Sequence, residues 1–323
     1  MSVNFRVQLY CLLLMLSALK GEGRYLQENE VTAEGLFSLL NSEVKRESST
    51  DFIYRRPLRC LDMLSVEGQF IFSTDRPQLN CAAYFIAEPG EVISVEFSAV
   101  DIDCRRGDFL KVFDGWFLKG EKFPSNEDHP LPLPERYVDY CDTGMPRRVV
   151  RSSQNVAMIF FRVHSPESGF TITVRKLINP FPCNIISQTR EGSFTMVIPH
   201  QRTNCSFSII YPVEIQIEEL SLGRLGSNDA PVKRSVPGCG GTGDFVELLG
   251  GNGVDTAKMF PVADICYSLK GPAQLKVGCD NAVMRLVSSG KFINRVTFQY
   301  RPLDHHELQK LKGNDVEDFC FIE

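Results

Sequence analysis

From residue 54 onward, short apolar runs alternate with turns rich in Pro, Gly, Asn and Asp. The runs have strand length, and no stretch of ten residues carries a convincing helical period. Many short strands separated by turns predict an all-β chain built as an antiparallel sandwich. The strands that we expect are 70–72, 82–86, 92–97, 109–113, 156–163, 170–174, 194–198, 206–211, 213–217, 245–249, 283–287 and 296–300.

The strand pattern occurs twice. Residues 67–81 and 191–205 both read Glu-Gly-x-Phe followed by Asn-Cys, at identical spacing. A Gly-Asp-Phe triplet also follows a cysteine in each half, at residues 107–109 and 243–245. A recurrence this regular predicts one small unit built twice. Duplication of a module is a common way to make a binding surface, so the repeat favours a binding protein over an enzyme.

The repeat sets the expected domains. We expect the first at residues 54–177 and the second at residues 183–302, joined by the stiff, extended linker 179–182, which reads Asn-Pro-Phe-Pro. The length of 323 residues agrees with two domains of ordinary size. Residues 303–323 then form a mainly polar C-terminal tail that Cys320 ties down.

The two units differ mainly in their loops. The first carries a polar, Pro-rich insertion at residues 116–136, which contains His129. The second has a long stretch at residues 223–238, rich in Gly, Ser, Asn, Asp and Pro around a Lys-Arg pair. Such a composition predicts an exposed, protease-sensitive loop at residues 223–238.

The N-terminus indicates the compartment. Arg6 precedes an apolar run from residue 7 to 19, after which the chain becomes polar, a pattern typical of a signal peptide over residues 1–22. A transmembrane anchor, the alternative, needs about 20 apolar residues. We therefore expect a secreted, extracellular protein with no membrane span, and a loosely ordered extension at residues 23–53.

The cysteine count agrees with secretion. Of eleven cysteines, Cys11 leaves with the signal peptide, and the remaining ten form an even set. Their order in the two units corresponds, so if the units fold alike their disulfides must correspond too. No Cys-x-x-Cys motif is present, which makes zinc and redox interpretations weak. The remaining cysteines are Cys60, Cys81, Cys104, Cys141, Cys183, Cys205, Cys239, Cys266, Cys279 and Cys320.

Composition narrows the function further. Hydrophobic residues make up 43% of the chain and charged residues 23%, values typical of a globular protein. The formal net charge of −5 disfavours a general nucleic-acid binder, which needs a basic face. We expect no cofactor, and the oligomeric state stays open.

Several motifs together resemble the CUB domain family. These are the four cysteines per unit, the stretch Gly-Asp-Phe-Leu-Lys-Val-Phe-Asp-Gly at 107–115, and Ser-Gly-Phe at 168–170. The resemblance implies a jelly-roll-like sandwich in which the first cysteine bonds to the second and the third to the fourth. With one further pair for the tail, the implied disulfides are Cys60–Cys81, Cys104–Cys141, Cys183–Cys205, Cys239–Cys266 and Cys279–Cys320.

A wider match covers almost the whole chain. The signal peptide and the stretches 59–65, 107–120, 152–163 and 243–251 are similar to the corticotropin-releasing factor-binding protein family. That resemblance implies a non-enzymatic protein that sequesters corticotropin-releasing factor and urocortin-type peptides, which are amphipathic helices. The alternative function is a CUB adhesion or adaptor module that binds an extracellular protein through calcium.

Calcium sites of CUB domains use carboxylates from separate loops. Asp101, Asp103 and Asp108 cluster around Cys104, and Asp108 matches the central ligand of the family. The loop that should supply the other carboxylate, residues 164–168, contains no Asp. In the second unit Asp244 matches, but residues 288–291 supply a lysine. We therefore favour Asp108 and Asp244 as hydrogen-bond acceptors within loops, and we predict no metal.

The candidate ligand-binding residues lie at the start of the first unit. Arg55, Arg56, Arg59 and Asp62 flank the disulfide cysteine Cys60. Arginine beside apolar residues is typical of surfaces that recognise an acidic or amphipathic peptide. A solvated strand edge explains the same composition equally well, and both interpretations stay open.

The second unit carries an N-glycosylation sequon, Asn204-Cys205-Ser206, which its counterpart at Asn80 lacks. We expect a glycan on Asn204, which would keep that surface away from partners. The glycine-rich stretch 238–243 fits a nucleotide-binding motif only formally, because a strand rather than a helix should follow it. No nucleophile or metalloprotease motif is present, so we predict no enzyme.

Overall fold

The computed structural model describes residues 53–73, 80–143, 149–164, 168–222, 239, 243–266, 269–311 and 320. The predicted signal peptide, the N-terminal extension before residue 53 and the predicted protease-sensitive loop 223–238 lie outside these ranges. From Arg55 onward the chain forms one compact unit that contains two β-sandwiches.

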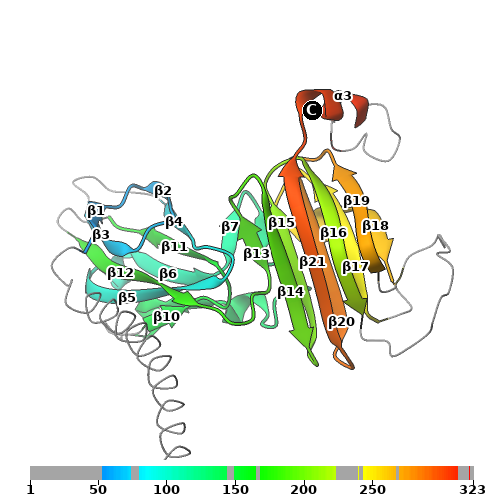
Figure 1. Ribbon diagram of the computed structural model, residues 1–323. Helices are drawn as coiled ribbons and strands as arrows, with labels where there is room; N and C mark the ends of the chain where they lie inside the picture. Colours follow the sequence, from blue (N-terminus) through cyan, green and yellow to red (C-terminus); the bar gives the residue numbers. More distant parts are fainter. Residues whose placement is uncertain are drawn as a thin grey trace, which may run out of the picture. The chain divides into compact units, whose positions relative to one another are not determined.

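The first sandwich consists of two five-stranded sheets (Figure 1). Its core is rich in phenylalanine: Phe70 lies 5.8 Å from Phe85, and Phe72 lies 4.5 Å from Phe161. The first sheet has the order β1 (Arg55–Pro57), β3 (Gly68–Ser73), β12 (Gly169–Ile178), β5 (Glu91–Asp101) and β10 (Val149–Arg151). The second has the order β2 (Leu61–Leu64), β4 (Cys81–Ile86), β11 (Val156–Arg162), β6 (Phe109–Asp114) and β9 (Tyr137–Asp139).

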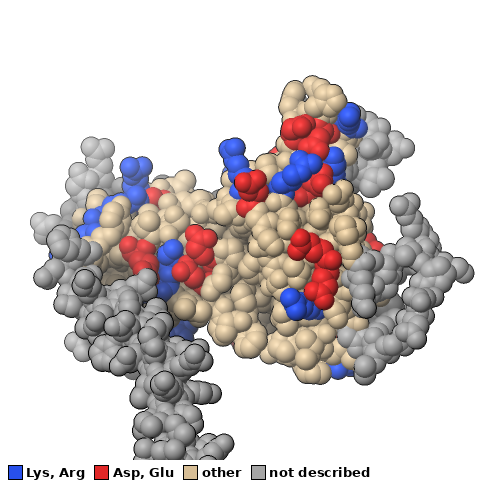
Figure 2. Space-filling view, in the orientation of Figure 1, with Lys and Arg blue, Asp and Glu red and all other residues tan. Residues whose placement is uncertain are grey.

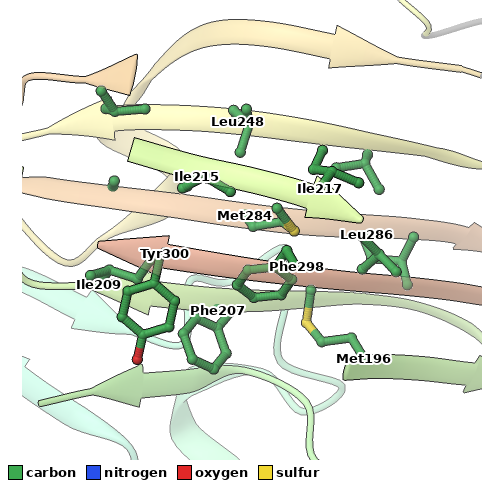
Figure 3. Close-up of a cluster of buried hydrophobic side chains, with 14 of the residues drawn as sticks. Met196, Phe207, Ile209, Ile215, Ile217, Leu248, Met284, Leu286, Phe298 and Tyr300 are labelled. Carbon is green, nitrogen blue, oxygen red and sulfur yellow. The ribbon is translucent and has the colours of Figure 1, made fainter. Parts of the chain in front are cut away.

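The second sandwich repeats this arrangement with nine strands. Its core contains Phe207 and Phe298, whose rings meet edge to face at 5.2 Å beside Met284 and Ile215 (Figure 3). One sheet has the order β13 (Ile185–Ser187), β15 (Arg202–Ile209), β20 (Asn281–Ser289), β17 (Phe245–Gly251) and β18 (Phe260–Ile265). The other has the order β14 (Gly192–Pro199), β21 (Ile293–Pro302), β16 (Val213–Leu222) and β19 (Leu269–Val277).

The predicted fold class is confirmed: the chain is all-β, with two tandem CUB-like, jelly-roll-like sandwiches. Each expected strand lies within or overlaps an observed one, because alternating apolar residues pack into the two cores. The structure adds short edge strands that the sequence did not predict. Three of these pair in parallel rather than antiparallel fashion: β1 with β3, β2 with β4, and β13 with β15.

Short helical elements connect the strands. They are the 3₁₀ turns η2 (Cys104–Arg106), η3 (Leu133–Glu135) and η5 (Thr256–Lys258), together with α2 (Tyr140–Thr143) and α3 (His305–Leu311). Within the described ranges, no helix is long and apolar enough to cross a membrane.

Five disulfides connect the strands and the tail. They join the pairs Cys60–Cys81, Cys104–Cys141, Cys183–Cys205, Cys239–Cys266 and Cys279–Cys320. The first and third of these occupy equivalent places: each holds the parallel edge strand, β2 or β13, against its neighbour in the sheet, β4 or β15. This constraint fixes the edge strands although they are only three or four residues long.

The insertion at residues 116–136 differs from the polar loop that the sequence predicts. It begins with a hairpin, β7 (Trp116–Leu118) and β8 (Glu121–Phe123), and its middle is buried. The side chain of His129, expected in a polar loop, is 1% exposed. The polar groups of the insertion can be buried because they have hydrogen-bond partners, many of them in the second sandwich.

Asp128 in this insertion is the centre of the contact between the sandwiches. Its side chain is fully buried and lies 2.6 Å from the guanidinium of Arg285 on β20. The Thr256 hydroxyl donates to the same carboxylate at 2.7 Å, and the Asn184 amide donates to the Asp128 carbonyl at 3.1 Å. Although burial opposes it, the charges of Asp128 and Glu247 raise the pKa of Arg285.

Further contacts surround this ion pair. The Asn155 side chain donates to the Ile186 carbonyl at 2.8 Å and accepts from its N–H at 3.1 Å. Ile186 also packs in an apolar cluster with Trp116. Glu121 accepts the backbone N–H of Val254 at 2.7 Å, next to Gly253, where a Cβ atom would collide with that carboxylate. The two sandwiches are therefore held by both polar and apolar contacts.

Replacing Arg285 by methionine should lower the free energy of unfolding by about 3 kcal/mol, because it leaves the Asp128 carboxylate buried without its cation. Denaturant unfolding with intact disulfides measures this change. The control is Arg301→Met, since Arg301 is 47% exposed and its loss should cost less than about 1 kcal/mol. Combining Arg285→Met with Asp128→Leu should cost less than the sum of the single changes, and strict additivity would contradict the coupling.

Candidate functional site

The predicted arginine cluster lies where the two sheets of the first sandwich meet at their edges. Arg56 is on β1 of one sheet, Asp62 is on β2 of the other, and their side chains form an ion pair. The backbone N–H of Arg59 also donates to the Asp62 carboxylate at 3.3 Å. The Asp62 side chain is 8% exposed and that of Arg56 is 28% exposed. The pair therefore ties the edge strands of the two sheets together.

The ion pair changes the acidity of Asp62. Burial opposes ionisation, but the hydrogen bonds and charge of Arg56, with the Arg59 N–H, hold the pKa of Asp62 below its ordinary value of 3.8. The carboxylate is consequently charged throughout the neutral range and keeps Arg56 in place.

Other residues of this edge face solvent. Arg55 and Arg59 are exposed, and so are two apolar side chains of β2, Leu61 at 71% and Met63 at 56%. Basic side chains are visible over this end of the first sandwich in Figure 2. The structure thus brings together three of the four predicted ligand-binding residues, Arg56, Arg59 and Asp62, and it adds Leu61 and Met63, which the sequence did not single out. Arg55 pairs with Gln69 and points to the opposite side of β1 from Arg56, so it lies on the outer face of the first sheet.

An apolar pocket opens on the outer face of the second sheet of the first sandwich, the sheet that contains β2 and β4. Its cavity volume is about 470 Å³, a size typical of ligand sites. The nine residues that line it come from β4, β11, β6, β9, β7 and η3, and all but the tyrosine hydroxyls are apolar: Ala82, Tyr84, Phe113, Phe117, Leu133, Pro134, Tyr137, Met158 and Phe160.

The walls of the pocket are fixed in advance. The Tyr84 hydroxyl donates to the Phe117 carbonyl at 2.8 Å, which holds β7 against the sheet. The Trp116 indole N–H lies 3.1 Å from the carbonyls of both Phe85 and Ala157. Such anchoring keeps the pocket open without a ligand and reduces the entropy lost on binding.

Arg136 holds the η3 wall of the pocket. Its guanidinium donates to the carbonyls of Pro124 at 2.7 Å, Ser125 at 3.0 Å and Leu131 at 2.9 Å. Burial lowers its pKa, and the nearby carboxylates of Asp114, Asp128 and Asp255 oppose that shift. Arginine is protonated at neutral pH in proteins, so the guanidinium keeps all its donors and holds this segment in place.

Strand pairing connects the pocket with the exposed edge. Ala82 on β4 pairs with Phe160 of β11 on one side and with Leu61 of β2 on the other. In the same way Tyr84 pairs with Met158 and with Met63. The apolar surface therefore runs without interruption from the pocket to Leu61 and Met63.

Two of the three aspartates considered for calcium, Asp103 and Asp108, accept hydrogen bonds. Asp108 is 3% exposed and accepts the N–H of Asp103 at 3.0 Å and both the N–H and the ring Nδ1 of His164 at 2.9 and 2.7 Å. Asp103 accepts the N–H groups of Arg105 and Arg106. Asp101 is exposed. Among the described residues, no group of three or more His, Cys, Asp or Glu is placed to hold a metal ion.

Asp244 has the equivalent role in the second sandwich. It accepts from the N–H of Ser289 at 2.9 Å and from its hydroxyl at 2.8 Å, and from the Asn294 amide at 2.7 Å. Both aspartates therefore link two loops by accepting hydrogen bonds.

One polar cluster superficially resembles a catalytic arrangement. Asp114 accepts from the Ser153 hydroxyl at 3.0 Å and lies 3.0 Å from His129 Nε2. The aspartate stands between the serine and the histidine, and His129 Nδ1 accepts the N–H of Leu131. The serine bonds to the aspartate rather than to the histidine, which is not the order of a catalytic triad, so the cluster serves to organise the insertion.

Asn204, the sequon residue, lies close to the first sandwich. Its side-chain amide donates to the Glu127 carbonyl at 3.3 Å, and it borders a polar groove of about 620 Å³ that both sandwiches line. The surface expected to stay away from partners is thus next to the contact between the sandwiches.

Fold and site together define a pair of disulfide-linked CUB-like sandwiches whose candidate site is an apolar pocket beside a basic edge. Residues 52–178 match the profile described as corticotropin-releasing factor binding protein N-terminal domain, and residues 185–309 match the C-terminal domain of the same family. The chain belongs to this family, which is a family of binding proteins.

Relatives match over nearly the full length. The chain is 59% identical over 320 residues to the corticotropin-releasing factor-binding protein of Homo sapiens, covering 99% of each chain. It is 60% identical over 314 residues to that of Xenopus laevis, covering 97% of each. A solved structure of the CUB1-EGF-CUB2 domains of rat MASP-1 aligns with 77% of this chain and 100% of its own, at 13% identity and a TM-score of 0.24.

The pH dependence of stability tests the Arg56–Asp62 pair. Because the folded pKa of Asp62 lies below its unfolded value, the pair stabilises the fold above about pH 4, and this contribution disappears as the pH falls through the folded pKa. Asp62→Asn should therefore be less stable than the parent at pH 7, and the difference should be smaller at about pH 3. Unfolding by urea at both pH values measures the difference, and a difference that persists undiminished in acid would contradict the ion pair.

Proposed function

We propose that this protein is a secreted, non-enzymatic binding protein that captures corticotropin-releasing factor and urocortin-type peptides and withholds them from their receptors. Membership of the family supports the ligand class, because the relatives over the full length are named for binding corticotropin-releasing factor. Five disulfides support an oxidising, extracellular environment.

The observation that carries the proposal is the basic and apolar edge formed by β1 and β2. An amphipathic helix presents apolar side chains on one face and charges beside them. Leu61 and Met63 offer apolar contacts, and Arg59 offers a cation to acidic groups of a peptide. The Arg56–Asp62 pair holds this edge in a fixed conformation, which favours binding by reducing the ordering that binding requires.

Sequestration follows from burial of the same peptide surface that a receptor would contact. No chemistry on the peptide is needed, since a bound peptide is released intact when it dissociates. The competing function, a calcium-bridged adhesion module, depends on carboxylates that bind the ion, and Asp108 and Asp103 already accept hydrogen bonds from N–H groups.

Titration of the purified protein with fluorescently labelled corticotropin-releasing factor should give saturable binding. The affinity should be the same in buffer with excess EDTA, because the proposed contacts need no ion. Binding that disappears with EDTA and returns with calcium would support the adhesion module instead. A failure of the peptide to bind under either condition would overturn the proposed function.

The double variant Arg56→Ala, Asp62→Ala should bind the labelled peptide about tenfold more weakly or worse, because β2 loses its tie to β1 and no longer presents Leu61 and Met63 in a fixed position. Secretion should be retained, since the Cys60–Cys81 disulfide still holds β2 on β4. The matched control is Glu214→Ala, Arg301→Ala, which removes an ion pair of 2.6 Å from the second sandwich. Equal affinities of both variants would remove this edge from the binding site.

A further inference from the structure

The outer faces of the two sandwiches can be compared residue by residue. Counting from the repeated cysteines, Ala82 on β4 is equivalent to Ser206 on β15, and its partner Phe160 is equivalent to Arg285. On the edge strands, Met63 is equivalent to Ile186, since they pair with the equivalent residues Tyr84 and Ser208. The same structural surface therefore exists in both units.

In the second sandwich this surface is covered by another part of the chain. Ile186 is 1% exposed and packs with Trp116, and Arg285 binds Asp128 of the insertion. In the first sandwich the equivalent surface remains open at its edge. Met63 is 56% exposed, Leu61 is 71% exposed, and the pocket lies beside them.

The chemistry of the two faces also differs. The covered face presents Arg285, which binds Asp128 of the insertion, and Ser206, which donates to Asn184, whereas the open face presents Ala82 and Phe160. A surface that accepts a polar segment in one unit has become apolar in the other. Its occupant must supply large apolar side chains.

We propose that the pocket on the first sandwich binds large apolar side chains from the apolar face of a helical, amphipathic peptide, a site that extends the β1–β2 edge. This inference rests on the proposed function, which supplies a ligand of that class. The peptide helix lies across β11, β4 and β2, from the pocket to Leu61 and Met63, and an acidic group of the peptide meets Arg59.

The dimensions fit such a helix. Two steps between neighbouring strands, from β11 to β4 and from β4 to β2, measure about 10 Å. An α-helix covers that distance in about seven residues, or two turns. Apolar side chains seven positions apart on one face of a helix can thus occupy the pocket and contact Met63 at the same time. The pocket volume of about 470 Å³ is within the range of ligand sites.

Ala82→Trp tests the pocket by filling it. Ala82 is partly exposed and lines the cavity, so the indole enters the space intended for the peptide without removing any core side chain. A second variant, Leu133→Asp, puts a carboxylate on the η3 wall. Each should weaken binding of labelled corticotropin-releasing factor by about tenfold or more. Circular dichroism and thermal unfolding check that each variant folds.

The matched control is Ala99→Trp, the same substitution at an exposed position of β5 in the other sheet. It should change the affinity by less than about twofold. If both pocket variants fold and bind the peptide with the parent's affinity, the pocket is not part of the binding site. The proposed function would survive that result, because the parent protein would still bind the peptide. No binding by the parent protein would instead overturn the proposed function.

A probe of the pocket identifies the occupant. The dye 1-anilinonaphthalene-8-sulfonate should fluoresce with the parent protein, should do so much less with Ala82→Trp, and should be displaced by the peptide. A second copy of the chain would be the occupant if dye fluorescence per molecule rises on dilution. Analytical ultracentrifugation would then show a dimer of the parent protein that the substitution Ala82→Trp dissociates. Dye that binds only after residues 23–50 are removed would assign it to the chain's own N-terminal segment. Either result would overturn the peptide as occupant.

Discussion

The buried ion pair between Asp128 and Arg285 is the interaction on which the arrangement of the candidate site depends. It anchors the middle of the insertion at residues 116–136 on the second sandwich. The two ends of the same insertion supply pocket walls on the first sandwich, through Phe117 on β7 and Leu133 on η3. One segment therefore both joins the sandwiches and shapes the pocket, and Arg136 connects these roles by holding the carbonyls between them. A substitution at the contact between the sandwiches can consequently alter the shape of the pocket although the substituted residue does not line it.

Much of the fold could be predicted because its signals are local. Alternating apolar residues identify the long strands, and the repeated cysteine spacing, with the family resemblance, gives the disulfide pairs that the structure contains. The insertion could not be predicted in the same way. Its charged residues look solvated until their partners are known, and Arg285 lies 157 positions from Asp128. The edge strands β1 and β2 could not be predicted for a different reason: a strand of three or four residues is too short to show a clear alternation of apolar and polar residues.

The candidate site divides along the same line. Arg56, Arg59 and Asp62 are neighbours in sequence, so their proximity could be predicted, whereas the pairing of Arg56 with Asp62 across two sheets, and the position of Arg55 on the opposite side of β1, depend on the fold. The pocket brings together residues from 82 to 160, most of which look like ordinary core residues in their own strands, while Leu133 and Pro134 come from the turn η3. The sequence did contain one indication of Leu61 and Met63. They are apolar residues at alternate positions beside a disulfide cysteine, and such residues on an edge strand can face solvent.

The two units also explain how a duplicated scaffold can acquire a ligand site. Two equivalent sandwiches begin with equivalent outer faces, and one of them is used to hold the units together. The covered face then has to neutralise Asp128 of the insertion, which accounts for Arg285 in the place where the first unit has Phe160. The open face has no such obligation, and it keeps an apolar surface that a monomeric protein would ordinarily cover. The cost of exposing that surface is a physical reason to expect that a partner covers it.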